Sequence, residues 1–267
     1  MSRIGPAIAV LTLVLAGCGG FGAQGSPERL TPAPIPTDEA PYPPGVSERA
    51  IEPGVLARSH EGALRATSYT LRTHQRIKGE NGDILRRTNR SRRVAKNATR
   101  YRGYFVQNTT EYPSAGLTTR VDYWTNGSVV ATRYEERTGR QSLHMWPADS
   151  VDSVTDLTAR QRLEAVLGAV DMRIARHEAD GDVVLVGSEF VDRDRLIRPL
   201  FVSHPTNVSV QLQVRSDGTI VAMRLGYDAT LSGRDIRIVR ETRVTDEGTT
   251  TVDRPAWVAN ATMETEE

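Results

Sequence analysis

The spacing of apolar residues changes period along the chain. Residues 54–66 place apolar side chains such as Leu56 and Leu64 at helical spacings, with polar side chains between them, which predicts an amphipathic helix. Over residues 69–78 the period becomes two, and positions such as Leu71 alternate with polar and basic neighbours. That alternation is typical of a half-buried strand.

The two-residue period recurs as far as residue 245, interrupted by turn signals such as Asn-Gly, Asp-Gly and Ser-Gly. Further strands are expected at residues 84–95, 100–107, 119–125, 128–134, 140–145, 173–179, 182–190, 207–215, 220–229 and 234–245. Residues 156–170 form a second expected helix, with Asp156 or Thr158 as its N-cap. Because hairpins join most strands, the expected class is α+β: a curved, mostly antiparallel sheet of about ten strands, an incomplete β-barrel with two covering helices.

The N-terminus has the layout of an export signal. Residues 4–17 carry no charge and follow a single basic residue, Arg3, and they are too few for a permanent span, which needs ~20 residues. The string Leu-Ala-Gly-Cys that ends at Cys18 resembles a prokaryotic lipobox, in which the thiol receives a diacylglycerol-type lipid and the chain is cut before it. We therefore expect a lipid anchor on Cys18 and a protein held at the outer face of the cell membrane. The alternative is a buried cysteine that follows an apolar helix.

A proline-rich stretch follows the cysteine. Seven of the twenty residues in 26–45 are proline, which is typical of an extended, semi-rigid spacer. The expected organisation is a signal peptide at residues 1–17, a lipidated cysteine and stalk at 18–48, a half-barrel-like domain at 49–258 and an acidic tail at 259–267.

Several strings form a recognisable set: the lipobox, the stalk, PGVSERAIEPG, VDYWTNGSVVATRY and the late ladder GTIVAMRLGYDATLSG…IRIVRETR. Over most of residues 44–258 this set resembles a family of haloarchaeal lipoproteins of unknown function. The order of elements is also similar to that of the Lol-type lipoprotein carriers and the mycobacterial LppX/LprG-type lipoproteins. In those proteins an incomplete barrel holds acyl chains, so the resemblance implies a binder or carrier of an apolar or amphiphilic ligand.

The charges almost balance, with 34 Lys plus Arg against 33 Asp plus Glu. This balance gives no support for a nucleic-acid partner, which calls for a clustered basic excess, and it departs from the acidic excess that is usual in haloarchaeal proteins. A single cysteine excludes both a disulfide framework and a four-cysteine zinc site.

Six of the seven asparagines lie in Asn-x-Ser/Thr sequons, although Ser and Thr make up only 43 of 267 residues. The six are Asn89, Asn97, Asn108, Asn126, Asn207 and Asn260. The excess favours N-glycosylation at the cell surface. The alternative is Thr-rich strand chemistry with asparagine at turns.

Motifs for catalysis or metal binding are absent from the sequence. The five histidines are scattered, and no zinc, EF-hand, P-loop or nucleophile-elbow string occurs, so we expect neither an enzyme nor a cofactor. The string 192–195 alternates Asp and Arg, and mutual neutralisation at a solvated helix start is favoured over weak Ca²⁺ binding. The arginine run over residues 86–93 has two interpretations, phosphate head-group binding or the exposed outer face of a sheet.

The candidate ligand-binding residues lie on the expected concave face of the sheet: Leu71, Tyr104, Tyr123, Leu212, Met223 and Leu225. They line an apolar pocket if the sheet curves away from the helices, and they form a solid core if the helices pack against them. The leading hypothesis is therefore a membrane-anchored extracellular lipoprotein that binds or carries a lipid or another amphiphile. The alternative is a structural or interaction protein of the envelope that has no ligand.

Overall fold

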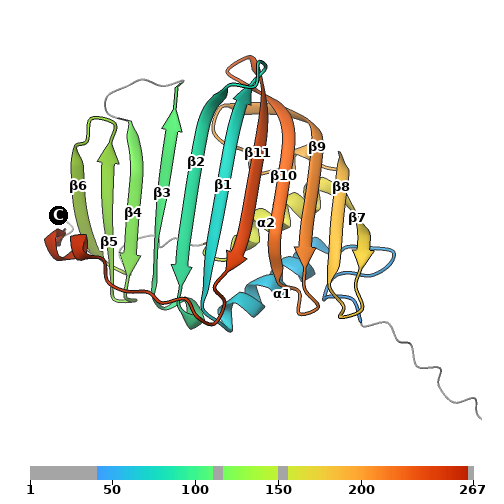
Figure 1. Cartoon of the computed structure of the whole chain (residues 1–267), viewed down its shortest axis with the longest axis horizontal. Helices are drawn as coiled ribbons and strands as arrows, with labels where there is room; N and C mark the ends of the chain where they lie inside the picture. Colours follow the sequence, from blue (N-terminus) through green and yellow to red (C-terminus); the bar gives the residue numbers. More distant parts are fainter. Residues whose placement is uncertain (1–40, 111–116, 150–155, 264–267) are drawn as a thin grey trace, which may run out of the picture. The chain divides into compact units, whose positions relative to one another are not determined.

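The computed structural model describes residues 41–110, 117–149 and 156–263. They form one sheet with two α-helices on one of its faces (Figure 1). The helices are α1 (Pro53–Arg65) and α2 (Arg160–Ala169), and short 3₁₀ turns are η1 (Lys96–Ala98), η2 (Arg193–Arg195) and η3 (Ala256–Asn260). The strands are β1 (Tyr69–Gly79), β2 (Ile84–Val94), β3 (Tyr101–Thr109), β4 (Thr118–Thr125), β5 (Val129–Glu136), β6 (Gln141–Pro147), β7 (Val170–His177), β8 (Val183–Phe190), β9 (Val202–Val214), β10 (Ile220–Leu231), β11 (Arg234–Thr245) and β12 (Thr262–Met263).

The strand order is β12-β6-β5-β4-β3-β2-β1-β11-β10-β9-β8-β7. Every neighbouring pair is antiparallel except the two-residue β12, which runs parallel to β6. One long-range pairing, β1 with β11, joins the two meanders at the centre of the sheet. The expected α+β class is confirmed: eleven antiparallel strands form an open sheet that is partly covered by two helices.

The main core lies between the helices and the half of the sheet formed by β1, β11, β10, β9, β8 and β7. Leu56 and Leu64 of α1 and Leu163 of α2 are buried, as the helical spacing of apolar residues predicts. On the sheet side, Leu212 and Leu225 are each 0% exposed. The two helices therefore close off this region of the sheet as a filled core.

Two elements begin four or more residues from the start that the sequence predicts. The prediction of Asp156 or Thr158 as the N-cap of the second helix is wrong, because α2 begins only after Ala159, which has a φ of 62°. The Asp156 carboxylate nevertheless accepts a hydrogen bond from the backbone N–H of Gln161. Strand β9 begins five residues early, at Val202, and its first part contains the left-handed φ values and register shifts of an irregular strand.

The opposite face of the sheet carries the C-terminal segment, which crosses in front of the strands in Figure 1. There Val258 of η3 packs with Trp124 and Ala131. At the other end of the described chain, Tyr42 stacks on His177 and Val46 is buried in the core, so ordered packing begins before residue 49. Cys18, the expected signal peptide and most of the expected stalk lie outside the described residues. None of the helices described is both long and apolar enough to cross a membrane.

Candidate functional site

Strand β2 distributes the arginine run over both faces of the sheet. Its register with β1 places Arg86, Arg90 and Arg92 on the helix face, and Arg87 and Arg93 on the opposite face. The interpretation of the run as an exposed outer face therefore holds for only part of it. Two of the helix-face arginines, Arg86 and Arg90, line a cavity on that face of the sheet.

We call this cavity the arginine pocket. It has a volume of about 350 Å³ and lies between the sheet, α2 and the segment that precedes β9. Its lining residues are Thr73, Gln75, Arg86, Thr88, Arg90, Phe105, Gln107, Arg162, Ile197, Arg198, Pro199, Leu200 and Arg240. Five of these side chains are guanidinium groups and none is a carboxylate. A cavity with this lining favours an anion.

Arg240 of β11 is the most deeply buried of the five, at 4% exposed. Its Nε and Nη2 donate hydrogen bonds to Oε1 of Gln75 at 2.8 and 2.6 Å. Its Nη1 has no hydrogen-bond partner among the described residues. Burial lowers the pKa of Arg240, because a charge removed from water has only a neutral amide to replace its hydration.

Two further arginines share this environment. Burial, together with the neighbouring charges of Arg92 and Arg162, lowers the pKa of Arg90 to about 10. The pKa of Arg162 is also lowered to about 10, first by burial and then by the charge of Arg240. Asp156 acts in the opposite direction on both groups, but it does not line the pocket. Arg240, Arg162 and Arg90 thus bring together positive charge that no carboxylate of the described residues pairs with directly.

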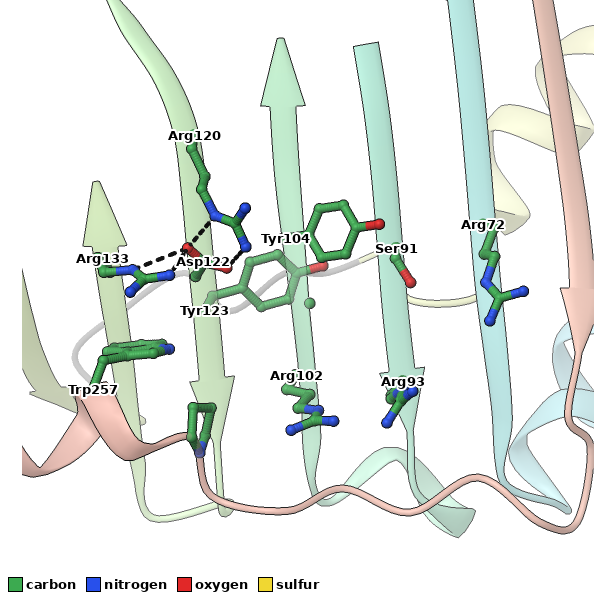
Figure 2. Close-up of a pocket in the computed structure, with 12 residues that line it drawn as sticks. Arg72, Ser91, Arg93, Arg102, Tyr104, Arg120, Asp122, Tyr123, Arg133 and Trp257 are labelled. Carbon is green, nitrogen blue, oxygen red and sulfur yellow. Dashed lines mark hydrogen bonds and ion pairs between the residues drawn. The ribbon is translucent and has the colours of Figure 1, made fainter. Parts of the chain in front are cut away.

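A second cavity lies on the opposite face of the sheet, and we call it the outer groove (Figure 2). Its volume is about 410 Å³, and its charged and aromatic lining comprises Arg72, Arg93, Arg102, Arg120, Arg133, Asp122, Tyr104, Tyr123 and Trp257. Figure 2 shows the Asp122 carboxylate between two guanidinium groups, with distances of 2.7 Å to Arg120 and 2.8 Å to Arg133. Burial alone would raise the pKa of Asp122, but these two hydrogen-bonded arginines hold it below its usual range.

The outer groove is electrostatically more balanced than the arginine pocket. Arg72 lies 3.6 Å from Asp246, and Arg133 lies over the ring of Trp257 at 5.6 Å. Arg120 lies over the ring of Tyr104 at 5.4 Å. Most of these cations therefore already have a partner, and exposed pairs of this kind contribute little individually.

The six predicted ligand-binding residues do not share one space. Leu71 and Tyr123 pack in a cluster beneath α1, and Leu212, Met223 and Leu225 lie in the larger core. Tyr104 is 38% exposed and lines the outer groove, so its assignment to the concave face is wrong. The physical reason is which residues of β3 face the helices. Gly103 lies on the helix face, where a Cβ would come within 2.4 Å of the Tyr123 hydroxyl. Because successive residues of a strand point to opposite faces, Tyr104 points to the other side.

Leu212 and Leu225 line none of the cavities described here, whereas Leu71 and Met223 border a narrow cavity of about 20 Å³ beside the arginine pocket. Arg162, Arg198 and Arg240 of the arginine pocket are not among the residues predicted from the sequence. A signal for Arg240 exists in the alternation of β11, where it occupies an inward position in phase with Ile236 and Ile238. A charged residue at an inward position is unusual without a partner.

The sequon asparagines differ in accessibility. Asn97, Asn108, Asn126, Asn207 and Asn260 are exposed, whereas Asn89 is half-buried within β2. The side chain of Asn89 hydrogen-bonds to His74. Glycosylation of all six stays a prediction, and Asn89 is the least accessible of them.

Histidines and acidic residues form no metal site in the described part of the chain, where no three His, Cys, Asp or Glu side chains cluster. His60 is buried at 1% exposed and joins α1 to two other segments. Its Nε2 donates to the Thr158 carbonyl at 3.0 Å, and its Nδ1 accepts from the backbone N–H of Ile220 at 3.0 Å. Burial lowers its pKa to about 4. In the 192–195 string, Asp192 accepts from the Asp194 N–H and pairs with Arg195 at 3.4 Å.

A family model describes chains with this sequence pattern. The model of a family of unknown function, DUF7537, matches residues 3–261. The chain belongs to this family. No curated protein matches the DUF7537 chain in sequence.

Two solved structures are similar at a low level. One is the MucA/MucB complex of Pseudomonas aeruginosa, with 13% identity, a TM-score of 0.31, and coverage of 76% of this chain and 61% of the other. The other is MucB in complex with MucA(peri), with 14% identity, a TM-score of 0.25, and coverage of 71% and 54%. The chain spans less than two thirds of both proteins, and at these TM-scores nothing about its function follows from the likeness.

Proposed function

We propose that this DUF7537 protein is a non-enzymatic binder of an amphiphilic ligand, held at the extracellular face of the cell membrane by a lipid on Cys18. The lipobox and the uncharged run before it support the anchor. Haloarchaeal origin, as the sequence resemblance implies, belongs to the same proposal. The ligand site differs from the apolar interior expected from sequence, because that interior is filled.

The observation that carries the proposal is an apolar rim on a charged cavity. Six large hydrophobic side chains in the described residues are exposed, and four of them lie between residues 191 and 201: Val191, Ile197, Leu200 and Phe201. Leu200 is 78% exposed, and with Ile197 it borders the arginine pocket. An exposed apolar edge beside a polar cavity suits a ligand that has both kinds of surface.

A second candidate is a structural or interaction domain of the envelope with no ligand. The filled core around Leu212 and Leu225 favours it, because a domain of this kind needs no cavity there. The two candidates differ in whether the rim beside the arginine pocket contacts a ligand.

Calorimetric titration of the full chain with dodecyl phosphate, below its micelle concentration, tests the proposed function. Leu200→Ser should weaken binding about tenfold, because most of one leucine contact with the alkyl chain is lost. Val191→Ser is the matched control: Val191 is exposed in the same segment but does not line the pocket, so its affinity should be unchanged. Absence of binding, or equal losses in both variants, would favour the domain without a ligand.

A further inference from the structure

Arg240 is the innermost cation of the arginine pocket and the least compensated. It is 4% exposed, and Gln75 satisfies only its Nε and Nη2. Its Nη1 lacks a partner among the described residues. Leaving a buried charged donor without an acceptor carries a large desolvation penalty. An anion bound in the pocket that Arg240 lines would offset this buried charge.

The other cations around the pocket come from three separate segments. Arg162 lies on α2, Arg90 lies on β2, and Arg198 follows η2. No ion pair links Arg90 or Arg162 to any described carboxylate within 4.0 Å. Arg198 has a distant contact of 3.8 Å to Asp194, which is 95% exposed. Solvent screens that contact, so the pocket keeps a strongly positive potential.

We propose that the arginine pocket binds a phosphate group, placed inward against Arg240, Arg162 and Arg90. A phosphate monoester carries about −1.5 to −2 charges and three acceptor oxygens. Guanidinium groups form paired, parallel hydrogen bonds to such oxygens. A carboxylate brings about half that charge and would leave more of the charge of Arg240, Arg162 and Arg90 unbalanced. The claim that an apolar chain of the ligand extends outside the pocket rests on the proposed function. The claim that the pocket binds phosphate does not.

The size and polarity of the cavity also determine the orientation. A volume of about 350 Å³ is at the lower end of ligand pockets, which span roughly 300–1,000 Å³. The floor is cationic, and the rim at Ile197 and Leu200 is apolar. An amphiphile would therefore bind with its head group inward and its chain outward. This is the reverse of a carrier that holds acyl chains within its barrel.

Three probes separate the phosphate site from the amphiphile site: inorganic phosphate, dodecyl phosphate and dodecyl maltoside, each titrated calorimetrically into the full chain. Arg240→Gln and Arg162→Gln each remove one cation from the pocket. If one of these two variants fails to fold, the other still tests the site. Arg93→Gln is the matched control, because Arg93 lies in the outer groove on the same strand as Arg90. Circular dichroism verifies that each variant is folded.

Dodecyl phosphate should bind more tightly than either other probe by at least about tenfold. Both pocket variants should weaken the binding of inorganic phosphate and of dodecyl phosphate by about tenfold or more. Arg93→Gln should change these affinities by less than about twofold. Leu200→Ser should weaken the binding of dodecyl phosphate and leave the binding of inorganic phosphate unchanged. If dodecyl maltoside binds as tightly as dodecyl phosphate, or if the pocket variants bind phosphate normally, the phosphate site is overturned while an amphiphile binder remains. If dodecyl phosphate binds no better than inorganic phosphate, the amphiphile function fails and the phosphate site stands.

Discussion

Replacing Arg162 with methionine should stabilise the protein without ligand. Burial and the charge of Arg240 lower the pKa of Arg162 from its usual range to about 10. At pH values near 7, where the group is charged, that difference corresponds to about 3 kcal/mol of unfavourable environment. Arg162 keeps partial contact with solvent, which reduces this figure, so we expect a gain of about 1–2 kcal/mol in the free energy of unfolding. Methionine has similar length and helix propensity.

Arg160→Met is the matched control in the same helical turn. Both arginines lie in the first turn of α2, so each substitution removes a similar unfavourable interaction with the helix dipole. Arg160, however, lies 3.0 Å from Glu61. Its replacement should lower the free energy of unfolding by up to about 1 kcal/mol, because that ion pair is lost.

Urea denaturation of both variants in phosphate-free buffer measures the difference. The expected result is opposite signs: a higher midpoint for Arg162→Met and a lower one for Arg160→Met, with unchanged slopes. If Arg162→Met loses as much stability as Arg160→Met, the guanidinium of Arg162 is a favourable part of the fold. The inference of an uncompensated charge in the arginine pocket would then be refuted.

Further predictions concern other parts of the molecule. The folded state keeps His60 neutral with a pKa of about 4, below the ordinary 6.5. Its contribution to stability is therefore present above pH 6.5 and is lost as the pH falls towards 4. Urea curves should show that the stability advantage of wild type over His60→Gln shrinks by about 3 kcal/mol across that window, and a constant difference would contradict the prediction. Gly103→Ala should destabilise by about 1–3 kcal/mol, because its Cβ would meet the Ser91 carbonyl oxygen and the Tyr123 hydroxyl at 2.4 Å, whereas Gly62→Ala, with nothing within 4 Å, should be neutral or stabilising in thermal melts. Cys18→Ser should leave the protein unprocessed or released on membrane fractionation, and an equally processed and bound variant would argue against the anchor. Intact-mass analysis should find glycans at exposed turns such as Asn126 and less often at Asn89; no glycan at any of the six sites would count against surface selection of the sequons.

Much of the fold follows from local pattern. The two-residue alternation predicts β1 and β9–β11, because one face of each strand is buried against the helices. The turn glycines predict where the hairpins reverse. The start of α2 was predicted too early, since the chain takes a left-handed turn at Ala159 that sequence propensity does not reveal. Tyr104 was assigned to the wrong face, because β3 has aromatic residues in both phases and the small Gly103 decides which phase faces the helices.

The candidate site was less predictable, because it depends on long-range pairing. The arginine run of β2 was visible as a candidate for phosphate binding, but its division between the two faces required the register with β1. Gln75 and Arg240 are 165 residues apart and meet because β1 pairs with β11. No local signal predicts that pairing, nor the approach of α2 and the segment before β9 to the same cavity.

Native mass spectrometry of the full chain released from its own membranes, with wild type compared to Arg240→Gln, shows whether the arginine pocket holds a ligand. Wild type should carry a non-covalent adduct, and tandem fragmentation of the adduct should release a phosphate-containing amphiphile. Arg240→Gln should have lost most of that adduct while keeping the same covalent mass, apart from the substitution. A wild-type spectrum without an adduct, or one whose adduct is equally abundant in Arg240→Gln, would contradict the claim that the arginine pocket holds the ligand.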